Sequence, residues 1–193
     1  MYSIPDEEAP ATWSDLRART EELGFDMPSD ARTGALLRTL ASSKPGGRLL
    51  ELGTGTGLAT AWLLSGMNRA ALLVSVDNDA RVQSVAREVL GDDPRVTFVL
   101  ADGIEFLRSQ ELRSYDLVFA DAWPGKYESR DGALDLVKPG GFYVGDDMLP
   151  QPNWPDGHQA NVDALLLELR ALPDWSLVAP AWGSGFVIAV RRA

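Results

Sequence analysis

The chain has 193 residues, 45% of them hydrophobic, which is about the size of one domain with a substantial buried core. It contains no cysteine, so disulfide bonds and zinc–thiolate sites are excluded. Its formal charge of -10 disfavours binding to nucleic acid, because no dense cluster of Lys and Arg offsets the repulsion from phosphates. No apolar run approaches the roughly 18 residues of a membrane helix, and the acidic start is unlike a signal peptide. These features predict a cytoplasmic protein that does not enter membranes.

Two amphipathic helices are expected first along the chain. The pattern of residues 11–25 (ATWSDLRARTEELGF) predicts a helix that Gly24 closes. The pattern of residues 29–44 (SDARTGALLRTLASSK) predicts a second helix, with Ser29 or Asp30 as its N-cap and KPGG as its stop.

From Arg48 onward, apolar runs alternate with helical stretches. The runs typical of buried strands are residues 49–52, 71–76, 96–100, 117–120 and 142–144. The helical stretches that follow the first four of them are residues 58–67, 80–90, 104–109 and 126–137. Repeated strand–helix–strand units with short connections require right-handed crossovers, and therefore a parallel sheet covered on both faces.

The end of the chain breaks this alternation. A helix is expected over residues 159–171, followed by two strand-like runs, WSLVAP and GFVIAVRR, that only a few residues separate. Such a connection is too short for a parallel crossover, so the final strand should run antiparallel. Ordinary dinucleotide-binding sheets are mostly parallel throughout, which favours a different kind of fold.

The stretch RLLELGTGTGLATAWLL places Gly53, Gly55 and Gly57 at alternate positions behind a predicted strand that contains Glu51. The dinucleotide fingerprint has a different spacing, Gly-x-Gly-x-x-Gly, and binds a pyrophosphate at the start of a helix. A carboxylate beside this turn would repel a pyrophosphate and would suit a ligand with positive charge, such as an ammonium or a sulfonium. At these residues the sequence resembles the class I S-adenosylmethionine-dependent methyltransferases.

Three later strand ends extend the resemblance, which covers residues 48–190. Asp77 ends the run LLVSVD and is placed to accept the hydroxyls of a ribose. In the resembled family, residues in the place of Asp102 and Gly103 approach an adenine ring, and Asp121 ends the next strand. The resemblance thus implies that the following residues bind S-adenosylmethionine: Glu51, Gly53, Thr54, Gly55, Gly57, Asp77, Asn78, Asp102, Gly103 and Asp121.

The resemblance also implies the architecture. It is an α/β fold with a Rossmann-like seven-stranded sheet in the order 3-2-1-4-5-7-6, mostly parallel with an antiparallel last strand, and helices on both faces. Residues 1–193 are expected to form a single domain, with a helical N-terminal segment (1–46) and an α/β core (47–193).

Three carboxylates are expected at the carboxyl ends of two neighbouring strands, Asp121 after one and Asp146 and Asp147 after the other. Because carboxylates gathered in this way repel one another, a hard divalent cation such as Mg²⁺, Ca²⁺ or Mn²⁺ is their natural partner. The arrangement is similar to that of the cation-dependent O-methyltransferases, the group of the catechol and caffeoyl-CoA enzymes. In that group the metal binds two neighbouring hydroxyls of the substrate and makes one of them easier to ionise.

The sequence departs from that group at two points. Its pair is Asp146-Asp147 where the group has Asp-Asn, and Pro124 stands where the group has a catalytic lysine. Lys126 is the candidate replacement, and it reaches the site only if WPGKY folds as a tight turn. His158, the only histidine, is the alternative general base.

The predicted function is therefore S-adenosylmethionine-dependent O-methyl transfer to a small, catechol-like hydroxylated acceptor, assisted by a divalent cation. Trp123 and Trp154, beside the same strand ends, are expected either to sandwich a flat substrate or to serve as packing residues. The alternatives are a catalytically altered relative that binds S-adenosylmethionine, a polyamine-synthase-like aminopropyl transferase and an NAD-dependent oxidoreductase. The related group also includes tRNA-modifying enzymes, which the acidity disfavours. The oligomeric state stays open, with a homodimer among the possibilities.

Overall fold

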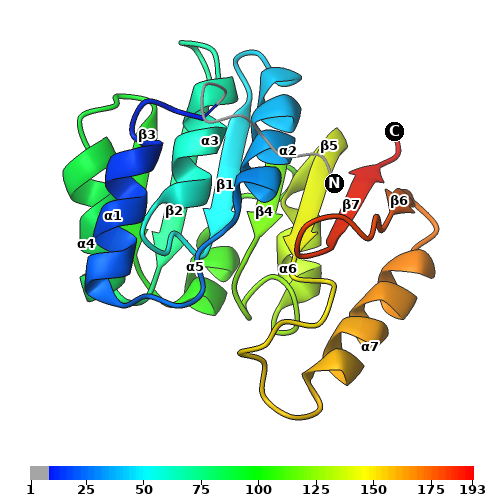
Figure 1. The fold of residues 1–193 in the computed structure, drawn as a ribbon. Coiled ribbons are helices and arrows are strands. Elements are labelled where there is room, and N and C mark those ends of the chain that lie inside the picture. The colour runs from blue at the N-terminus through cyan, green and yellow to red at the C-terminus, as the bar shows by residue number, and fades with distance from the viewer. Residues whose placement is uncertain (1–8) are drawn as a thin grey trace.

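A single seven-stranded sheet forms the centre of the protein in a computed structural model that describes residues 9–193 (Figure 1). The strands are β1 (Arg48–Leu52), β2 (Leu72–Asp77), β3 (Val96–Leu100), β4 (Tyr115–Ala120), β5 (Val137–Asp146), β6 (Trp175–Val178) and β7 (Phe186–Arg191). Their order in the sheet is β3-β2-β1-β4-β5-β7-β6. Strand β7 is antiparallel to both of its neighbours, and all other pairs are parallel. The predicted order and the antiparallel last strand are confirmed.

Seven helices in the described part of the chain cover the two faces of the sheet. They are α1 (Trp13–Leu23), α2 (Ala31–Ser42), α3 (Leu58–Gly66), α4 (Ala80–Leu90), α5 (Gly103–Ser109), α6 (Arg130–Asp135) and α7 (His158–Arg170). Helices α1 to α4 supply the apolar side chains of one core cluster, and α5 to α7 supply those of the other. None of the helices within residues 9–193 is long and apolar enough to cross a membrane.

The central strands are mostly apolar because both of their faces are buried. Along β1, Leu49 packs into the cluster of α1 to α4, and its neighbour Leu50 packs into the opposite cluster. Along β4, Leu117 and Val118 divide in the same way. Successive strand side chains point to opposite faces, so a continuous apolar run is the pattern that a doubly covered parallel strand requires.

The first two helices end and begin as predicted. Gly24 closes α1 in the left-handed conformation, with a φ of 70°, which a residue without a Cβ adopts at little cost. Asp30 is the N-cap of α2, since its carboxylate accepts hydrogen bonds from the backbone N–H groups of Arg32 and Thr33. Ser29, the other candidate cap, is free to contact a different part of the chain.

The helix predicted over residues 126–137 is much shorter in the structure, where α6 spans only Arg130–Asp135. The backbone N–H groups of residues 126–128 all donate to the carbonyl of Trp123, which closes a tight turn instead of a helix. Ser129 then adopts a left-handed φ of 51°, so helical geometry begins only after it.

The fifth strand is longer than the predicted residues 142–144. Val137 pairs with Tyr115, and Phe142 pairs with Leu117, so the register shifts between them and absorbs the turn at Gly140. The strand therefore starts five residues earlier than its apolar pattern indicated.

Gly34 is required by the packing of α2 on α3. A Cβ added at Gly34 would lie 2.2 Å from the ring of Trp62, which is fully buried. Alanine in place of glycine within a helix normally stabilises it by up to about 1 kcal/mol. We expect the opposite here: Gly34→Ala should lower the free energy of unfolding by about 1–3 kcal/mol, measured by urea denaturation.

Thr39→Ala, on the exposed side of the same helix, is the control and should change the free energy of unfolding by no more than about 0.5 kcal/mol. A Gly34→Ala protein as stable as the wild type would contradict the packing argument.

Candidate functional site

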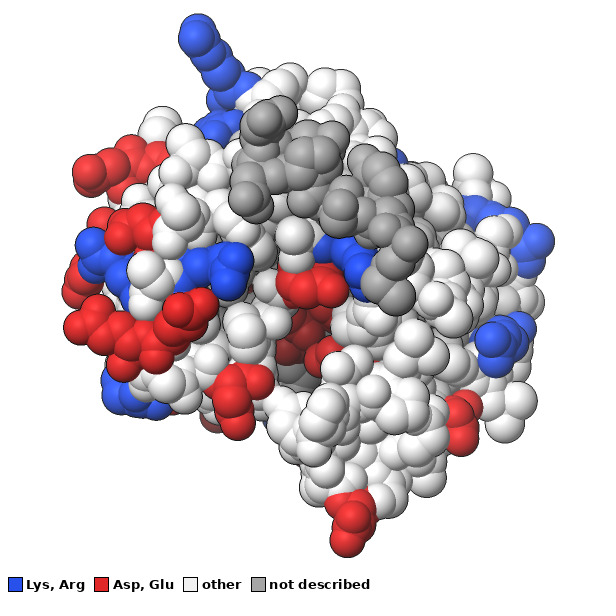
Figure 2. Space-filling model, in the orientation of Figure 1, with Lys and Arg blue, Asp and Glu red and all other residues white. Residues whose placement is uncertain are grey.

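A cavity of about 1000 Å³ opens at the carboxyl ends of the parallel strands. Four segments line most of it: residues 25–30 between α1 and α2, the glycine turn after β1, the turn after β4 and the loop between β5 and α7. In open α/β sheets this edge is where ligands bind, next to the point at which the strand order reverses. Acidic side chains gather at a hollow near the middle of the face drawn in Figure 2.

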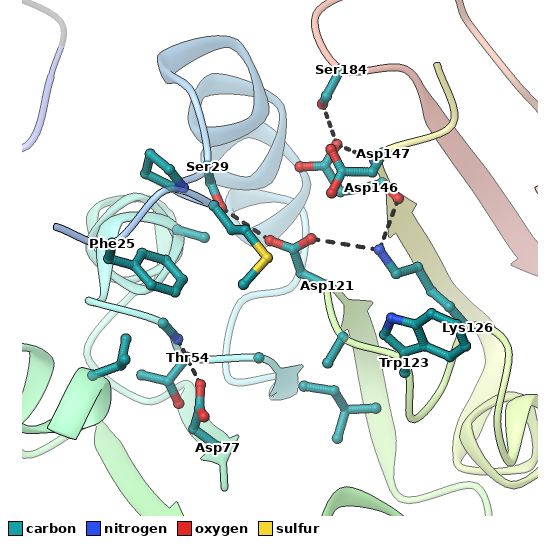
Figure 3. Close-up of a pocket in the computed structure, with 18 of the residues that line it drawn as sticks. Phe25, Ser29, Thr54, Asp77, Asp121, Trp123, Lys126, Asp146, Asp147 and Ser184 are labelled. Carbon is teal, nitrogen blue, oxygen red and sulfur yellow. Dashed lines mark hydrogen bonds and ion pairs between the residues drawn. The ribbon is translucent and has the colours of Figure 1, made fainter. Parts of the chain in front are cut away.

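The glycine turn folds across the end of β2. The backbone N–H groups of Gly53 and Thr54 both donate to the carbonyl of Val76, and the N–H of Gly55 donates to Oδ2 of Asp77 at 2.8 Å. Gly53 has a φ of 98°, and a Cβ there would lie 2.6 Å from the carbonyl oxygen of Asp121. Glycine is therefore required at position 53. The hydrogen bond from Gly55 fixes the Asp77 carboxylate at the cavity wall (Figure 3).

The end of β3 contributes Asp102, which caps the helix that follows it. The Asp102 carboxylate accepts hydrogen bonds from the N–H groups of Ile104 and Glu105, which begins α5, and both Asp102 and Gly103 line the cavity. Of the ten residues predicted to bind the cofactor, the cavity wall thus contains eight: Gly53, Thr54, Gly55, Asp77, Asn78, Asp102, Gly103 and Asp121.

Glu51, which was predicted to bind the cofactor, does not line the cavity. Its side chain is fully buried beneath the turn, where Oε2 accepts hydrogen bonds from the hydroxyls of Thr60 and Ser75 at 2.6 and 2.5 Å. Burial raises the pKa of Glu51 to about 7. Ser75 also shares a hydrogen bond with Thr54, so Glu51 supports the glycine turn from below.

Gly57 is the second predicted residue outside the cavity wall. Its φ is 93°, and a Cβ there would lie 2.7 Å from the Cβ of Ala86. The third glycine therefore permits close packing of α4 against the turn and does not face the cavity.

Lys126 lies at the opposite end of the cavity, because WPGKY does fold as a tight turn. Gly125 adopts a φ of 89°, and its carbonyl accepts a hydrogen bond from the hydroxyl of Tyr143 at 2.7 Å. The ammonium of Lys126 lies 3.7 Å from Oδ1 of Asp121 and donates to the carbonyl oxygen of Asp146 at 3.2 Å. The Lys126 side chain is 6% exposed, so this contact is nearly sealed from solvent.

The carboxylates of Asp121 and Asp146 are held by hydroxyl groups from distant segments. Ser29 donates to Asp121, and Asp146 accepts hydrogen bonds from the hydroxyls of Thr33 and Ser184. Burial raises the pKa of both carboxyls, and their mutual repulsion raises that of Asp121 further. The pKa of Asp146 rises to about 6.

Asp147 lies beside them in a left-handed backbone conformation, with a φ of 60°. Its N–H donates to Oδ1 of Asp146 at 2.7 Å, and its own carboxylate forms no hydrogen bond or ion pair with residues 9–193. Asp121, Asp146 and Asp147, the three carboxylates predicted as metal ligands, all line the same cavity. Within the described chain, however, no group of three or more His, Cys, Asp or Glu residues has an arrangement that could hold a metal ion.

His158 begins α7 and is packed among three aromatic rings near Lys126. Its ring centroid lies 4.5 Å from that of Trp154, 5.1 Å from Tyr127 and 5.7 Å from Trp123. The Nδ1 atom is buried and has no hydrogen-bond partner among the described residues. Burial, followed by the charge of Lys126, lowers the pKa of His158 below 6.5, so the imidazole is neutral at pH 7.

Sequence reasoning missed the residues that hold the carboxylates, namely Ser29, Thr33 and Ser184. Hydroxyl residues are common in loops and helix starts, and nothing in their local pattern indicates a partner more than 30 residues away. Phe25, beside Gly55 at the other end of the cavity, was also missed, because its local pattern indicates no contact with the glycine turn.

The family model described as "Methyltransferase domain" matches residues 50–148, just over half of the chain. A protein of Mycolicibacterium vanbaalenii named "Putative O-methyltransferase" is 33% identical over 134 residues, which cover 66% of this chain and 58% of that relative. The chain thus spans little more than half the length of this curated relative.

Two crystal structures share the fold over almost the whole chain. One is described as a "putative O-methyltransferase from Klebsiella pneumoniae". It has a TM-score of 0.83 at 26% identity, and the match covers 98% of this chain and 92% of that chain. The other is the O-methyltransferase TomG from Streptomyces achromogenes, which is involved in tomaymycin synthesis and was solved in complex with SAM. Its TM-score is 0.83 at 24% identity, and the match covers 96% of this chain and 92% of TomG. Together with the glycine turn and the sheet order, the family match shows that this chain belongs to the methyltransferase domain family.

Proposed function

We propose that this protein is an S-adenosylmethionine-dependent O-methyltransferase that acts on a small hydroxylated, catechol-like acceptor. The observation that carries the proposal is a single cavity with two chemically different ends. One end has the glycine turn and the Asp77 carboxylate, and the other has Lys126, Asp121 and an aromatic cluster around His158. We further propose that residues 1–193 act as one domain, since α1 and α2 pack into the same core cluster as the sheet.

The end at Asp77 suits S-adenosylmethionine. The Asp77 carboxylate is fixed by the N–H of Gly55, and each of its oxygens keeps acceptor capacity for a ribose hydroxyl. Glycine at position 53 lets a ligand approach the backbone closely. Negative charge along the wall favours a cationic ligand, and the cofactor, when bound, supplies a sulfonium methyl group. The SAM complex of TomG, which has the same fold, supports this choice.

The other end suits a flat acceptor with a hydroxyl group. Trp123 and Trp154 lie at the cavity wall and offer aromatic faces to a planar ring. The neutral imidazole of His158 is able to accept the proton that the hydroxyl loses. Holding donor and acceptor in reacting geometry supplies roughly 7–11 kcal/mol in favourable cases, so binding accounts for much of the rate.

The divalent cation implied by the family resemblance does not fit this set of residues well. Both carboxylate oxygens of Asp146 already accept hydrogen bonds, from Thr33, Ser184 and the N–H of Asp147. A positively charged group, the ammonium of Lys126, already lies beside Asp121. No step of the proposed reaction is therefore assigned to a metal.

Asp77→Ala tests the cofactor end. The variant should bind S-adenosylhomocysteine about 10- to 150-fold more weakly, because it loses charge-assisted hydrogen bonds worth about 1.5–3 kcal/mol. Isothermal titration calorimetry gives the affinity, and NAD serves as the competing ligand. Asp92→Ala, at an exposed position outside the cavity, is the control and should bind like the wild type. Unchanged affinity in Asp77→Ala would rule out this role, and tighter binding of NAD would refute the proposed cofactor.

His158→Gln tests the acceptor end with a panel of catechol-like compounds, with S-adenosylhomocysteine formation as the readout. Loss of a general base should lower kcat by about 100-fold or more, with the affinity for S-adenosylhomocysteine unchanged.

In the wild type the base acts in its neutral form, so kcat/KM should stay constant through pH 7. It should fall only as the pH drops through the pKa of His158, which lies below 6.5. The groups that influence this titration are Lys126 and Asp147, and the rings of Trp123, Tyr127 and Trp154 surround the imidazole. A His158→Gln profile with the same acid limb as the wild type would assign the proton transfer to another group.

A further inference from the structure

We infer that Lys126 is the fixed cation of this site: its ammonium occupies the place between the ends of β4 and β5 that a divalent metal would take, so that methyl transfer needs no metal ion. The inference rests on the proposed O-methyl transfer for its catalytic part. Its structural part, exclusion of divalent cations by the ammonium, stands without it.

The position of the ammonium supports this directly. Figure 3 shows the Lys126 side chain reaching from the tight turn to the gap between Asp121, at the end of β4, and Asp146, at the end of β5. The distances are 3.7 Å to Oδ1 of Asp121 and 3.2 Å to the carbonyl oxygen of Asp146. The side chain is 6% exposed, and a buried charge is retained only where it is paired.

The carboxylates are arranged for this partner and not for a metal ion. Three donors hold the Asp146 carboxylate, and Ser29 holds the second oxygen of Asp121. Ca²⁺ requires six to eight oxygen ligands, and Mg²⁺ requires nearly ideal octahedral geometry. A divalent ion would have to share the carboxylate oxygens with these donors and remain beside an ammonium of the same sign.

The ammonium has a chemical role that a metal otherwise fills. It has three N–H donors, of which one donates to the carbonyl oxygen of Asp146, and Lys126 lines the cavity. A remaining donor is available to the acceptor oxygen, where it stabilises negative charge as the hydroxyl proton passes to His158. The acceptor oxygen then forms its bond to the methyl carbon, and the carbon–sulfur bond breaks with its electron pair remaining on sulfur. Lys126 stays charged throughout and is not the base.

Mn²⁺ binding is the decisive measurement, and it requires no acceptor. Calorimetry and thermal unfolding with Mn²⁺ should show no binding to the wild type at millimolar concentration. Lys126→Met removes the charge at similar length and leaves the carboxylates uncompensated, so it should bind Mn²⁺ and unfold at a higher temperature when Mn²⁺ is present. Lys126→Gln, which keeps a donor for the Asp146 carbonyl, is the second variant if Lys126→Met does not fold.

Lys138→Met is the matched control, because Lys138 also pairs with an aspartate, Asp116, at 2.7 Å, but lies outside the cavity. This control should gain no Mn²⁺ binding and should keep wild-type methyl transfer. Turnover by the wild type should be unchanged in excess EDTA, and Lys126→Met should turn over at least about 100-fold more slowly.

Mn²⁺ binding by the wild type, or loss of its turnover in EDTA, would overturn the inference. A folded Lys126→Met or Lys126→Gln protein that still binds no Mn²⁺ would overturn it too, because the ammonium would then not be what excludes the metal. If neither variant folds, the two wild-type measurements decide. If no acceptor is methylated, the proposed function fails, whereas the Mn²⁺ comparison still tests the structural part.

Discussion

The turn from Trp123 to Glu128 determines most of the chemistry at the acceptor end of the cavity. Three successive N–H groups donate to the carbonyl of Trp123, and Gly125 takes a left-handed conformation in which a Cβ would lie 2.5 Å from Leu52. This geometry carries Lys126 back toward the sheet. Taking an ammonium and a carboxylate out of water costs several kcal/mol for each ion, so the pair with Asp121 persists only because its geometry and hydrogen bonds offset that cost.

The same turn brings the aromatic residues together. Trp123 and Tyr127 flank the turn and contact the ring of His158, which the start of α7 supplies from a distant part of the sequence. The charge of Lys126 contributes to the lowered pKa of His158, so the turn affects both a fixed cation and a neutral imidazole. One local conformation thus provides two groups of different charge on the same side of the cavity.

The helical N-terminal segment is part of the site as well as a cover for the sheet. Ser29 and Thr33 donate to Asp121 and Asp146, across 92 and 113 residues of sequence. Phe25 packs near Gly55 at the other end. Both ends of the cavity therefore depend on the loop between α1 and α2 and on the start of α2, which Asp30 fixes as a helix cap.

The sequence pattern was enough to determine the reversed last strand, the caps of α1 and α2, and the strand ends that carry the acidic residues. These features follow from local periodicity, glycine spacing and connection length, which are properties of neighbouring residues. The order of the strands in the sheet was implied only by the resemblance to the methyltransferase family. Only the tertiary structure decided where the side chains at those strand ends point and what holds them. The Glu51 side chain lies buried beneath the glycine turn, and residues 126–129 form a tight turn instead of a helix. The physical reason is that buried polar groups choose partners by distance in space, and here those partners come from segments far apart in the chain.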